Sequence, residues 1–239
     1  MEQQPYLEKI FIGKVKTIGN ANATTTMEKV WKSGMFKEPV RDSTWLGKVN
    51  LDGDEQADLK HHGGPEKAVM AYAQKHYIDW GRELNNSQIQ AGAMGENFSV
   101  INMDEETVCI GDIYEIGEAV IQVSQPRQPC WKPARRFKTI DFALRIQKSG
   151  RTGWYFRVLK EGFVKEQTAI KLIDRPYPEW TIAKCNEVMH EHKTDLDRSA
   201  QLAACRYLAI NWRETLTKRV QGQEAPSIAE RVYGPNVEK

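Results

Sequence analysis

Residues 119–138 read AVIQVSQPRQPCWKPARRFK. Ala119, Ile121 and Val123 alternate with other residues, which predicts a strand that ends at Val123. The segment that follows, residues 124–138, contains five basic side chains, three prolines and no acid. Because proline fixes φ and lacks an N–H, we expect this segment to be a stiff loop, and neither a helix nor a central strand.

Cys130 lies in the middle of this basic segment. Nearby cations favour a thiolate over a thiol, and a thiolate is both a nucleophile and a ligand for soft metals. The same cations suit a phosphate group. In the alternative interpretation, Cys130 is a small buried hydrophobic residue and the charges around it are simply solvated. The residue pattern alone leaves both interpretations open.

The chain up to about Asp174 is expected to be mainly β. Short extended segments alternate there with turns that contain Gly and Pro, which is typical of a barrel or a sandwich. Two amphipathic helices interrupt them, and Gly150 is a plausible C-cap for the second. The expected strands lie within residues 9–18, 44–51, 106–116, 119–123, 154–159 and 169–173, and the helices within residues 74–84 and 138–148.

The chain changes character after the two prolines in residues 175–178. Residues 179–220 predict about three short helices, with Thr181 as the N-cap of the first. Residues 222–239 are polar and are expected to lie over the surface. The expected division is a β domain over residues 1–176 and a helical extension over residues 177–239.

A histidine- and glycine-containing segment could also bind an anion. Gly63 and Gly64 let backbone N–H groups approach a ligand closely, and His62 and Lys67 could add side-chain donors. Adjacent histidines point in different directions on a helix or strand, so His61 and His62 make a poor zinc pair. An exposed turn is the alternative interpretation of this segment.

Residues 92–98 form a third segment with ligand-binding side chains. Glu96 and Asn97 offer a carboxylate and an amide, the groups that hydrogen-bond the edge of a heterocycle such as a pterin. An ordinary turn explains the same tripeptide. Glu96 and Asn97 are therefore candidate contacts for a heterocyclic ligand only if the neighbouring segments also form a binding site.

Composition excludes several classes of protein. The 239 residues carry a net charge of only +2, below the excess usual for a nucleic-acid-binding protein. Four cysteines without a C-x-x-C pair, no N-terminal apolar region and no apolar stretch of about 20 residues predict a cytoplasmic protein with free thiols. Cys185 and Cys205 fall on apolar helix faces and read as core. Dinucleotide-binding, P-loop, hydrolase and zincin motifs do not occur.

Taken together, five segments in this order resemble the MOSC family, the domain named for the C-terminal part of molybdenum cofactor sulfurases. The resemblance is strongest to its bacterial stand-alone, YiiM-type members and covers nearly the whole chain, including the helical tail. The last of the segments is the most specific. These segments are residues 53–57, 62–65, 95–98, 111–112 and 122–130.

The resemblance implies a mainly β, α+β fold: a partly closed barrel with a few helices and a C-terminal three-helix segment. It also implies binding of the molybdenum cofactor, with Cys130 as the single cysteine that ligates molybdenum. YiiM-type relatives reduce N-hydroxylated compounds such as hydroxylaminopurines. Sulfurase relatives handle sulfur, so the alternative is a cofactor carrier or sulfur-transfer protein that uses Cys130 as a persulfide site.

Several residues follow as candidates for the cofactor site. The arginine and lysine side chains of the basic segment, including Arg136, are expected to bind the cofactor phosphate and pterin. No lysine motif in the sequence supports the binding of pyridoxal phosphate, although Lys60 is one of the lysines that could still bind it. The full set of cofactor-binding candidates is His62, Gly63, Gly64, Lys67, Glu96, Asn97, Gln125, Arg127, Lys132 and Arg135.

Reduction also needs electrons, and the sequence has neither a flavin or dinucleotide fingerprint nor iron–sulfur spacing. A separate reductase or flavoprotein is therefore expected as the electron donor. No membrane or stable nucleic-acid partner is expected, whereas exposed strand edges and an apolar tail helix would permit a homodimer. A module that binds another anionic ligand, or an adaptor that works through its helical tail, is the remaining hypothesis.

Overall fold

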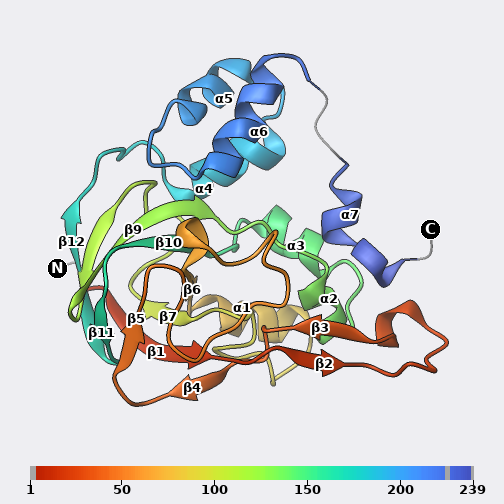
Figure 1. Cartoon of the computed structure of the whole chain (residues 1–239). Helices are drawn as coiled ribbons and strands as arrows, with labels where there is room; N and C mark the ends of the chain where they lie inside the picture. The colour runs from red at the N-terminus through yellow and green to blue at the C-terminus, as the bar shows by residue number, and fades with distance from the viewer. Residues whose placement is uncertain (1–3, 224–226, 238–239) are drawn as a thin grey trace.

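The computed structural model describes residues 4–223 and 227–237, and its centre is a closed seven-stranded β-barrel (Figure 1). The strand order is β12-β8-β9-β10-β6-β7-β1, and pairing of β1 with β12 closes the ring. The barrel strands are β1 (Tyr6–Ile12), β6 (Val69–Ala73), β7 (Phe98–Ile101), β8 (Ile113–Ile116), β9 (Ala119–Pro126), β10 (Trp154–Lys160) and β12 (Thr168–Asp174).

All barrel pairs are antiparallel except β6 with β7, which is parallel. The strand β4 (Glu38–Val40) adds to one edge of β1, and two small two-stranded sheets lie beside the barrel. These sheets join β5 (Thr44–Leu46) to β11 (Gly162–Val164), and β2 (Lys16–Ile18) to β3 (Trp31–Ser33). The sequence therefore predicted the class of fold correctly, and the resemblance predicted the barrel.

The sequence analysis did not identify β6 and β7. Every residue of β6 is buried, because one face contacts the barrel interior and the other contacts a second apolar cluster that contains Tyr72 and Trp80. A strand that is buried on both faces shows no alternation of apolar and polar residues. The alternation used to find the other strands could therefore not find this one.

Three helices pack beside the barrel: α1 (His76–Glu83), α2 (Lys132–Arg136) and α3 (Phe142–Ser149). The left-handed Gly150 at the end of α3 is the predicted C-cap. The basic segment, however, is not a loop throughout. Strand β9 continues to Pro126, and α2 carries Pro133 in its first turn, where a missing N–H removes no helical hydrogen bond.

The helical extension contains α4 (Ile182–Asn186), a π-helical turn (Glu187–Glu191), α5 (Leu196–Ala203) and α6 (Ile210–Val220). Thr181 caps α4 as predicted, because its side chain accepts a hydrogen bond from the Lys184 N–H at 3.2 Å. Cys185 and Cys205 are buried, as predicted, in an apolar cluster that continues into the barrel. The extension and the barrel thus share one hydrophobic core.

The last described residues were expected to lie over the surface, and this is wrong for part of them. The segment forms α7 (Ala229–Val232) and a 3₁₀ turn (Gly234–Asn236), and it returns from the extension to the side of α2 and α3 (Figure 1). Val232 and Asn236 are buried there. Short helices also occur at Thr26–Glu28 and Pro65–Lys67. Within the described ranges, no helix has the length and apolar character needed to cross a membrane.

Candidate functional site

Two cavities meet at Cys130. The first encloses about 630 Å³ and the second about 1150 Å³, each including space open to solvent. Both cavities are lined by His62, Lys67, Cys130, Lys132 and Tyr155. The cavity that also contains Lys37, Asp54, Asn97 and Arg127 is called the first cavity below, and the other is called the second cavity.

Cys130 lies between the end of β9 and the start of α2, and its side chain is half-buried. The three other cysteines are buried in the core. Burial raises the pKa of Cys109 and of Cys205 to about 11, which keeps those thiols protonated. Cys130 is therefore the most accessible of the four cysteines, and its role as a metal ligand stays a prediction.

Arg127 lines the first cavity and is only 6% exposed. Its Nη2 donates to the Met94 carbonyl at 3.3 Å, whereas its Nη1 has no hydrogen-bond partner among the residues that the structure describes. A buried guanidinium with an unused donor is costly unless an anion binds beside it. Arg127 therefore fits its predicted role in holding an anionic group.

Lys67 and Lys132 add two more cations at the junction of the cavities. The Lys67 ammonium donates to the His61 carbonyl at 2.8 Å, and burial lowers the pKa of Lys67. Burial, together with the charges of Lys132 and Lys67, lowers the pKa of His62 to about 3. His62 is thus a neutral imidazole at pH 7, able to hydrogen-bond a ligand without adding charge.

The two predicted glycines occupy different places. Gly63 lines the first cavity with a φ of 76°, and a Cβ there would lie 2.8 Å from Gln56 Oε1. Gly64 precedes the 3₁₀ turn that carries Lys67, and it is not among the described residues lining either cavity. Gly64 therefore shapes the backbone of the site and does not line it.

An ion pair between Lys37 and Asp54 lies in the wall of the first cavity, and the sequence analysis did not propose either residue as a ligand contact. Both side chains are buried, and burial lowers the pKa of Lys37. Asp54 also accepts from the Gly13 N–H at 2.9 Å and from Asn97 Nδ2 at 2.9 Å. Asp54 lies within the segment 53–57 that carried the resemblance, whereas no sequence pattern marks Lys37.

Asn97 lines the first cavity, but its amide is already used by the protein. Its Nδ2 also donates to the Phe11 carbonyl at 3.2 Å, and its Oδ1 accepts from the Met70 N–H at 3.2 Å. The side chain therefore holds the cavity wall together. Its predicted contact with a cofactor is not supported by this geometry.

Glu96 was expected to line the pocket, and the structure places it elsewhere. Its carboxylate is fully buried and accepts hydrogen bonds from the Tyr77 hydroxyl and, at 2.6 Å, from the Gly92 N–H. Burial raises the pKa of Glu96. Among the described residues, it belongs to neither cavity lining. Its neighbour Gly95 lines the first cavity instead, so the tripeptide is at the site although this side chain is not.

Arg135 and Arg136 were expected to bind the cofactor phosphate, but neither is among the described residues that line the two cavities. Arg135 donates to Asn236 Oδ1 at 2.8 Å and to the carbonyls of Lys29 and Pro235, and its guanidinium lies 4.9 Å from the Trp131 ring. Arg136 donates to the Met35 carbonyl at 2.8 Å. Helix α2 turns these two side chains away from the cavities, where chain carbonyls use their donors.

Gln125 lines the second cavity together with Tyr155, which the sequence analysis did not select. The amide is 2% exposed; its Nε2 donates to the Pro126 carbonyl at 3.2 Å, and its Oε1 has no partner within the described ranges. Burial raises the pKa of Tyr155, so its hydroxyl stays neutral. Tyr155 pairs with Gln125 in the β9–β10 ladder, a contact that only strand register determines.

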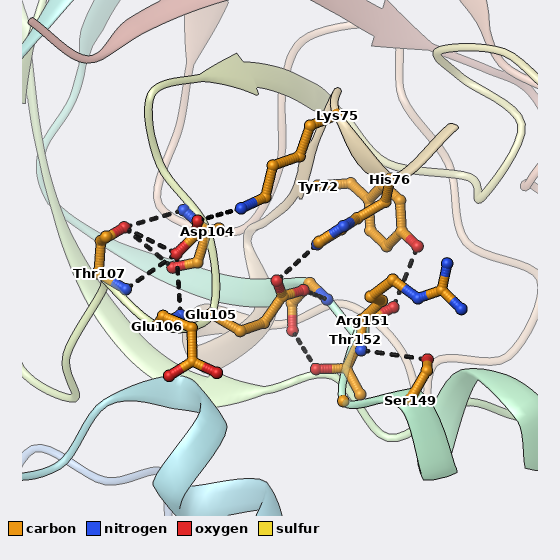
Figure 2. Close-up of polar contacts among 12 residues, drawn as sticks. Tyr72, Lys75, His76, Asp104, Glu105, Glu106, Thr107, Ser149, Arg151 and Thr152 are labelled. Carbon is orange, nitrogen blue, oxygen red and sulfur yellow. Dashed lines mark hydrogen bonds and ion pairs between the residues drawn. The ribbon is translucent and has the colours of Figure 1, made fainter. Parts of the chain in front are cut away.

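A buried hydrogen-bond network centred on Glu105 connects to the backbone of Arg127, and Figure 2 shows the Glu105 and His76 side chains of this network. The Glu105 carboxylate lies 2.7 Å from His76 Nε2 and accepts from the Gly153 N–H at 2.7 Å. The Gly153 carbonyl in turn accepts from the Arg127 N–H at 3.0 Å. The backbone of Arg127 is therefore fixed by residues that lie outside the cavity.

The helical extension also contacts the two segments that carry the site. The Ala209 N–H donates to the Ser124 carbonyl at 2.8 Å, and the Ile210 N–H donates to the Glu66 carboxylate at 2.9 Å. Ser124 Oγ donates to the Glu66 carbonyl at 2.6 Å and so joins the two segments directly. The start of α6 thus helps to position both Lys67 and the end of β9.

Comparison with known proteins identifies two family domains in the chain. Residues 58–171 match the MOSC domain, and residues 180–223 match the YiiM-like, 3-alpha helix domain. The chain is 38% identical to the uncharacterized protein YflK of Bacillus subtilis, over 79% of this chain and 85% of that protein. It is 34% identical to the protein YiiM of Escherichia coli, over 84% of this chain and 91% of that one.

Other relatives agree with this assignment. A protein named reductase from Gibberella moniliformis is 38% identical over 71% of this chain, a match that spans 30% of that longer protein. The crystal structure of YiiM from Geobacillus stearothermophilus superimposes with a TM-score of 0.76 at 32% identity, covering 90% of this chain and 99% of that one. The chain therefore belongs to the MOSC family, among the members that carry a YiiM-like three-helix domain.

Proposed function

We propose that this protein binds the molybdenum cofactor and reduces N-hydroxylated compounds. One observation carries the proposal. A half-buried thiol, Cys130, lies where two cavities meet, and the wall of one cavity contains a donor of the buried Arg127 that no described residue uses. A soft metal and an anionic group are the two chemical partners that this pair suits.

The residues of the first cavity fit such a cofactor. A thiolate is a suitable ligand for molybdenum. Arg127, Lys67 and Lys132 offer positive charge to a phosphate or a pterin carbonyl. Within residues 4–223 and 227–237, no group of three or more His, Cys, Asp or Glu side chains is arranged to hold a metal ion. Cys130 would accordingly be a single protein ligand to a metal that arrives with its other ligands.

The overall reaction is a two-electron reduction. An N-hydroxylated amine takes up two electrons and two protons, its N–O bond breaks, and the products are the amine and water. The cofactor, when bound, supplies the two-electron redox chemistry, and the protein supplies binding, orientation and protons. Lys67 Nζ is the proposed proton donor, because its pKa is lowered and it lies at the junction beside Cys130.

The electrons are proposed to come from a separate reductase or flavoprotein. The proposal rests on the sequence, which has no flavin or dinucleotide fingerprint and no iron–sulfur spacing. We expect the purified protein with NADH alone to leave a hydroxylaminopurine unreduced, and an added electron-donor protein to start turnover. Turnover with NADH and no second protein contradicts this part of the proposal.

The decisive experiment measures molybdenum in protein purified from a host that makes the cofactor, with Cys130→Ala beside the wild type. We expect near-stoichiometric metal in the wild type and a loss on the order of 100-fold or more in the variant, since it lacks the single protein ligand. Cys205→Ala is a control, because its thiol is buried away from the cavities. Activity on a hydroxylaminopurine should fall in parallel with metal content.

Three other outcomes contradict the proposal in different ways. Metal absent from both proteins, with sulfane sulfur on Cys130, would favour the sulfur-transfer alternative. Metal and sulfur both absent would favour a binding module for another anion. Equal molybdenum in both proteins would keep the cofactor and reject Cys130 as its ligand.

A further inference from the structure

The backbone that carries Cys130 has a single polar tether. This short loop joins the end of β9 to the start of α2 at Lys132. Among the described residues, the backbone of residues 128–130 takes part in one hydrogen bond, which the Pro129 carbonyl accepts from the Arg231 guanidinium. A loop segment with few hydrogen bonds opens more easily than its surroundings. The position of the half-buried thiol therefore depends on that one contact.

Arg231 reaches this loop from a distant part of the chain. It lies in α7, is half-buried, and lines the second cavity together with Cys130. Its other terminal nitrogen donates to the Oε1 atom of Gln147, a buried residue of α3. The guanidinium is planar, so two contacts at its ends fix its orientation. One side chain thus connects the loop that carries Cys130 to a helix packed beside the barrel.

The segment that carries Arg231 is held in place by several other contacts. Thr26 Oγ1 donates to the Asn236 carbonyl at 2.7 Å, and Asn236 Nδ2 donates to the Trp131 carbonyl at 3.0 Å. The 3₁₀ turn also packs directly on the indole, since a Cβ at Gly234 would lie 2.2 Å from Trp131 Cδ1. In Figure 1, α7 lies on the side of the molecule that carries α2 and α3. The segment therefore gives Arg231 a fixed base that does not depend on any one of these contacts.

We propose that Arg231 is a positioning residue that holds Cys130 at the junction of the two cavities. This inference rests on the function proposed above, in which Cys130 ligates the metal. Arg231 fixes the Pro129 carbonyl next to the thiol, and Gln147 orients the guanidinium from behind. Neither matched family domain extends beyond residue 223, so this role belongs to a segment outside both of them.

The test measures how fast iodoacetamide, a small neutral reagent, alkylates Cys130 in the full chain purified without metal. Mass spectrometry identifies the modified residue. Arg231→Lys keeps the positive charge but lacks the planar pair of N–H groups, so the loop opens more often and alkylation should be about threefold to fivefold faster. Gln147→Leu leaves Arg231 present but removes its second acceptor, and it should accelerate alkylation about twofold.

Arg219→Lys is the matched control. Arg219 is also a half-buried arginine that donates to carbonyls, those of Val188 and Met189, but it lies in the extension and lines neither cavity within the described ranges. We expect this variant to lose stability and to keep the wild-type alkylation rate. An unchanged rate in Arg231→Lys would overturn the inference. Equal acceleration in Arg219→Lys would overturn it as well, because the effect would then reflect general destabilisation.

Molybdenum content separates a failure of this inference from a failure of the proposed function. In protein from a host that makes the cofactor, we expect Arg231→Lys to hold about tenfold less metal than the wild type, because its ligand is misplaced. Metal in the wild type, with both metal content and alkylation unchanged in Arg231→Lys, rejects only the positioning role. Faster alkylation in Arg231→Lys, with no metal in the wild type, rejects only the proposed function.

Discussion

Arg127 and Lys132 lie in the first half of the basic segment, and Arg135 and Arg136 lie in the second half. The first pair faces a cavity, whereas the second pair forms hydrogen bonds within the protein. The first pair lines a cavity, and Arg127 keeps a donor that no described residue uses. The second pair donates to backbone carbonyls and to Asn236. A cation is thus available to a ligand only where the fold brings no acceptor to it, and sequence proximity does not decide this.

Exchanging the arginines one at a time is the sharpest test of this contrast. We expect Arg127→Gln to reduce molybdenum content about tenfold or more, because the cofactor loses one charge-assisted hydrogen bond. The same substitution should change the free energy of unfolding by less than about 1 kcal/mol. Arg135→Gln should lower the free energy of unfolding by about 2 kcal/mol, because three acceptors lose their donor, and leave metal content unchanged. Urea unfolding and metal analysis measure the two effects.

The same result in both variants would contradict the distinction between a ligand-binding Arg127 and a structural Arg135. A large loss of stability in Arg127→Gln would mean that this guanidinium is chiefly structural. A loss of metal in Arg135→Gln without a loss of stability would return Arg135 to the site, as the sequence first suggested.

Two lysines of the basic segment allow the same comparison between a cavity residue and a residue outside the cavities, with a smaller expected effect. Lys132 lines both cavities, whereas Lys138 is exposed and donates to the Met27 carbonyl at 3.2 Å. We expect Lys132→Gln to weaken binding of inorganic phosphate about twofold to fivefold, since a partly exposed charge contributes on the order of 1 kcal/mol or less. Lys138→Gln should not change it. Equal effects, measured by titration at low salt, would mean that phosphate responds only to net charge.

Two half-buried histidines give the smallest expected effect. The pKa of His62 and of His190 is lowered to about 3, by burial first and then by neighbouring cations. Because each folded-state value lies below the ordinary 6.5, each group favours the folded state above pH 6.5, and that contribution is lost as pH falls toward 3. Phosphate in the first cavity should raise the pKa of His62, because it offsets Lys132 and Lys67, and leave His190 unchanged.

Imidazole titration by NMR, with and without inorganic phosphate, gives both pKa values in one experiment. His190 is an internal control, since it lies in the π-helical turn of the extension and lines neither cavity within the described residues. Parallel shifts of both histidines would indicate a general effect of ionic strength, and no shift of His62 would argue against an anion in the first cavity.

The residues that the sequence analysis selected line one cavity where a residue type and its immediate neighbours define the chemistry. Cys130, Arg127, Lys132 and Lys67 lie where the basic and glycine-containing segments suggested. Glu96 shows the opposite case, because its carboxylate turns inward to the Tyr77 hydroxyl, a partner brought by α1. Nothing in a tripeptide indicates on which side of the backbone a buried partner will lie.

The expected loop at residues 124–138 failed for a local reason and a distant one. Proline was taken to exclude a helix, yet Pro133 stands in the first turn of α2, where its missing N–H removes no helical bond. The C-terminal segment then packs on this helix through Asn236, which accepts from Arg135 and donates to the Trp131 carbonyl at 3.0 Å. A contact across about a hundred residues leaves no trace in a local pattern.

The sequence by itself determined the mainly β architecture, the change to helices after residue 178 and the placement of one cysteine among cations, because alternation, proline positions and charge are local properties of the chain. The tertiary structure alone decided which cations stay free, which carboxylates are buried, and that α6 and α7 help to form the wall of a second cavity. Those outcomes depend on hydrogen-bond acceptors and side chains contributed by distant segments, and only closure of the barrel and return of the C-terminal segment bring these together.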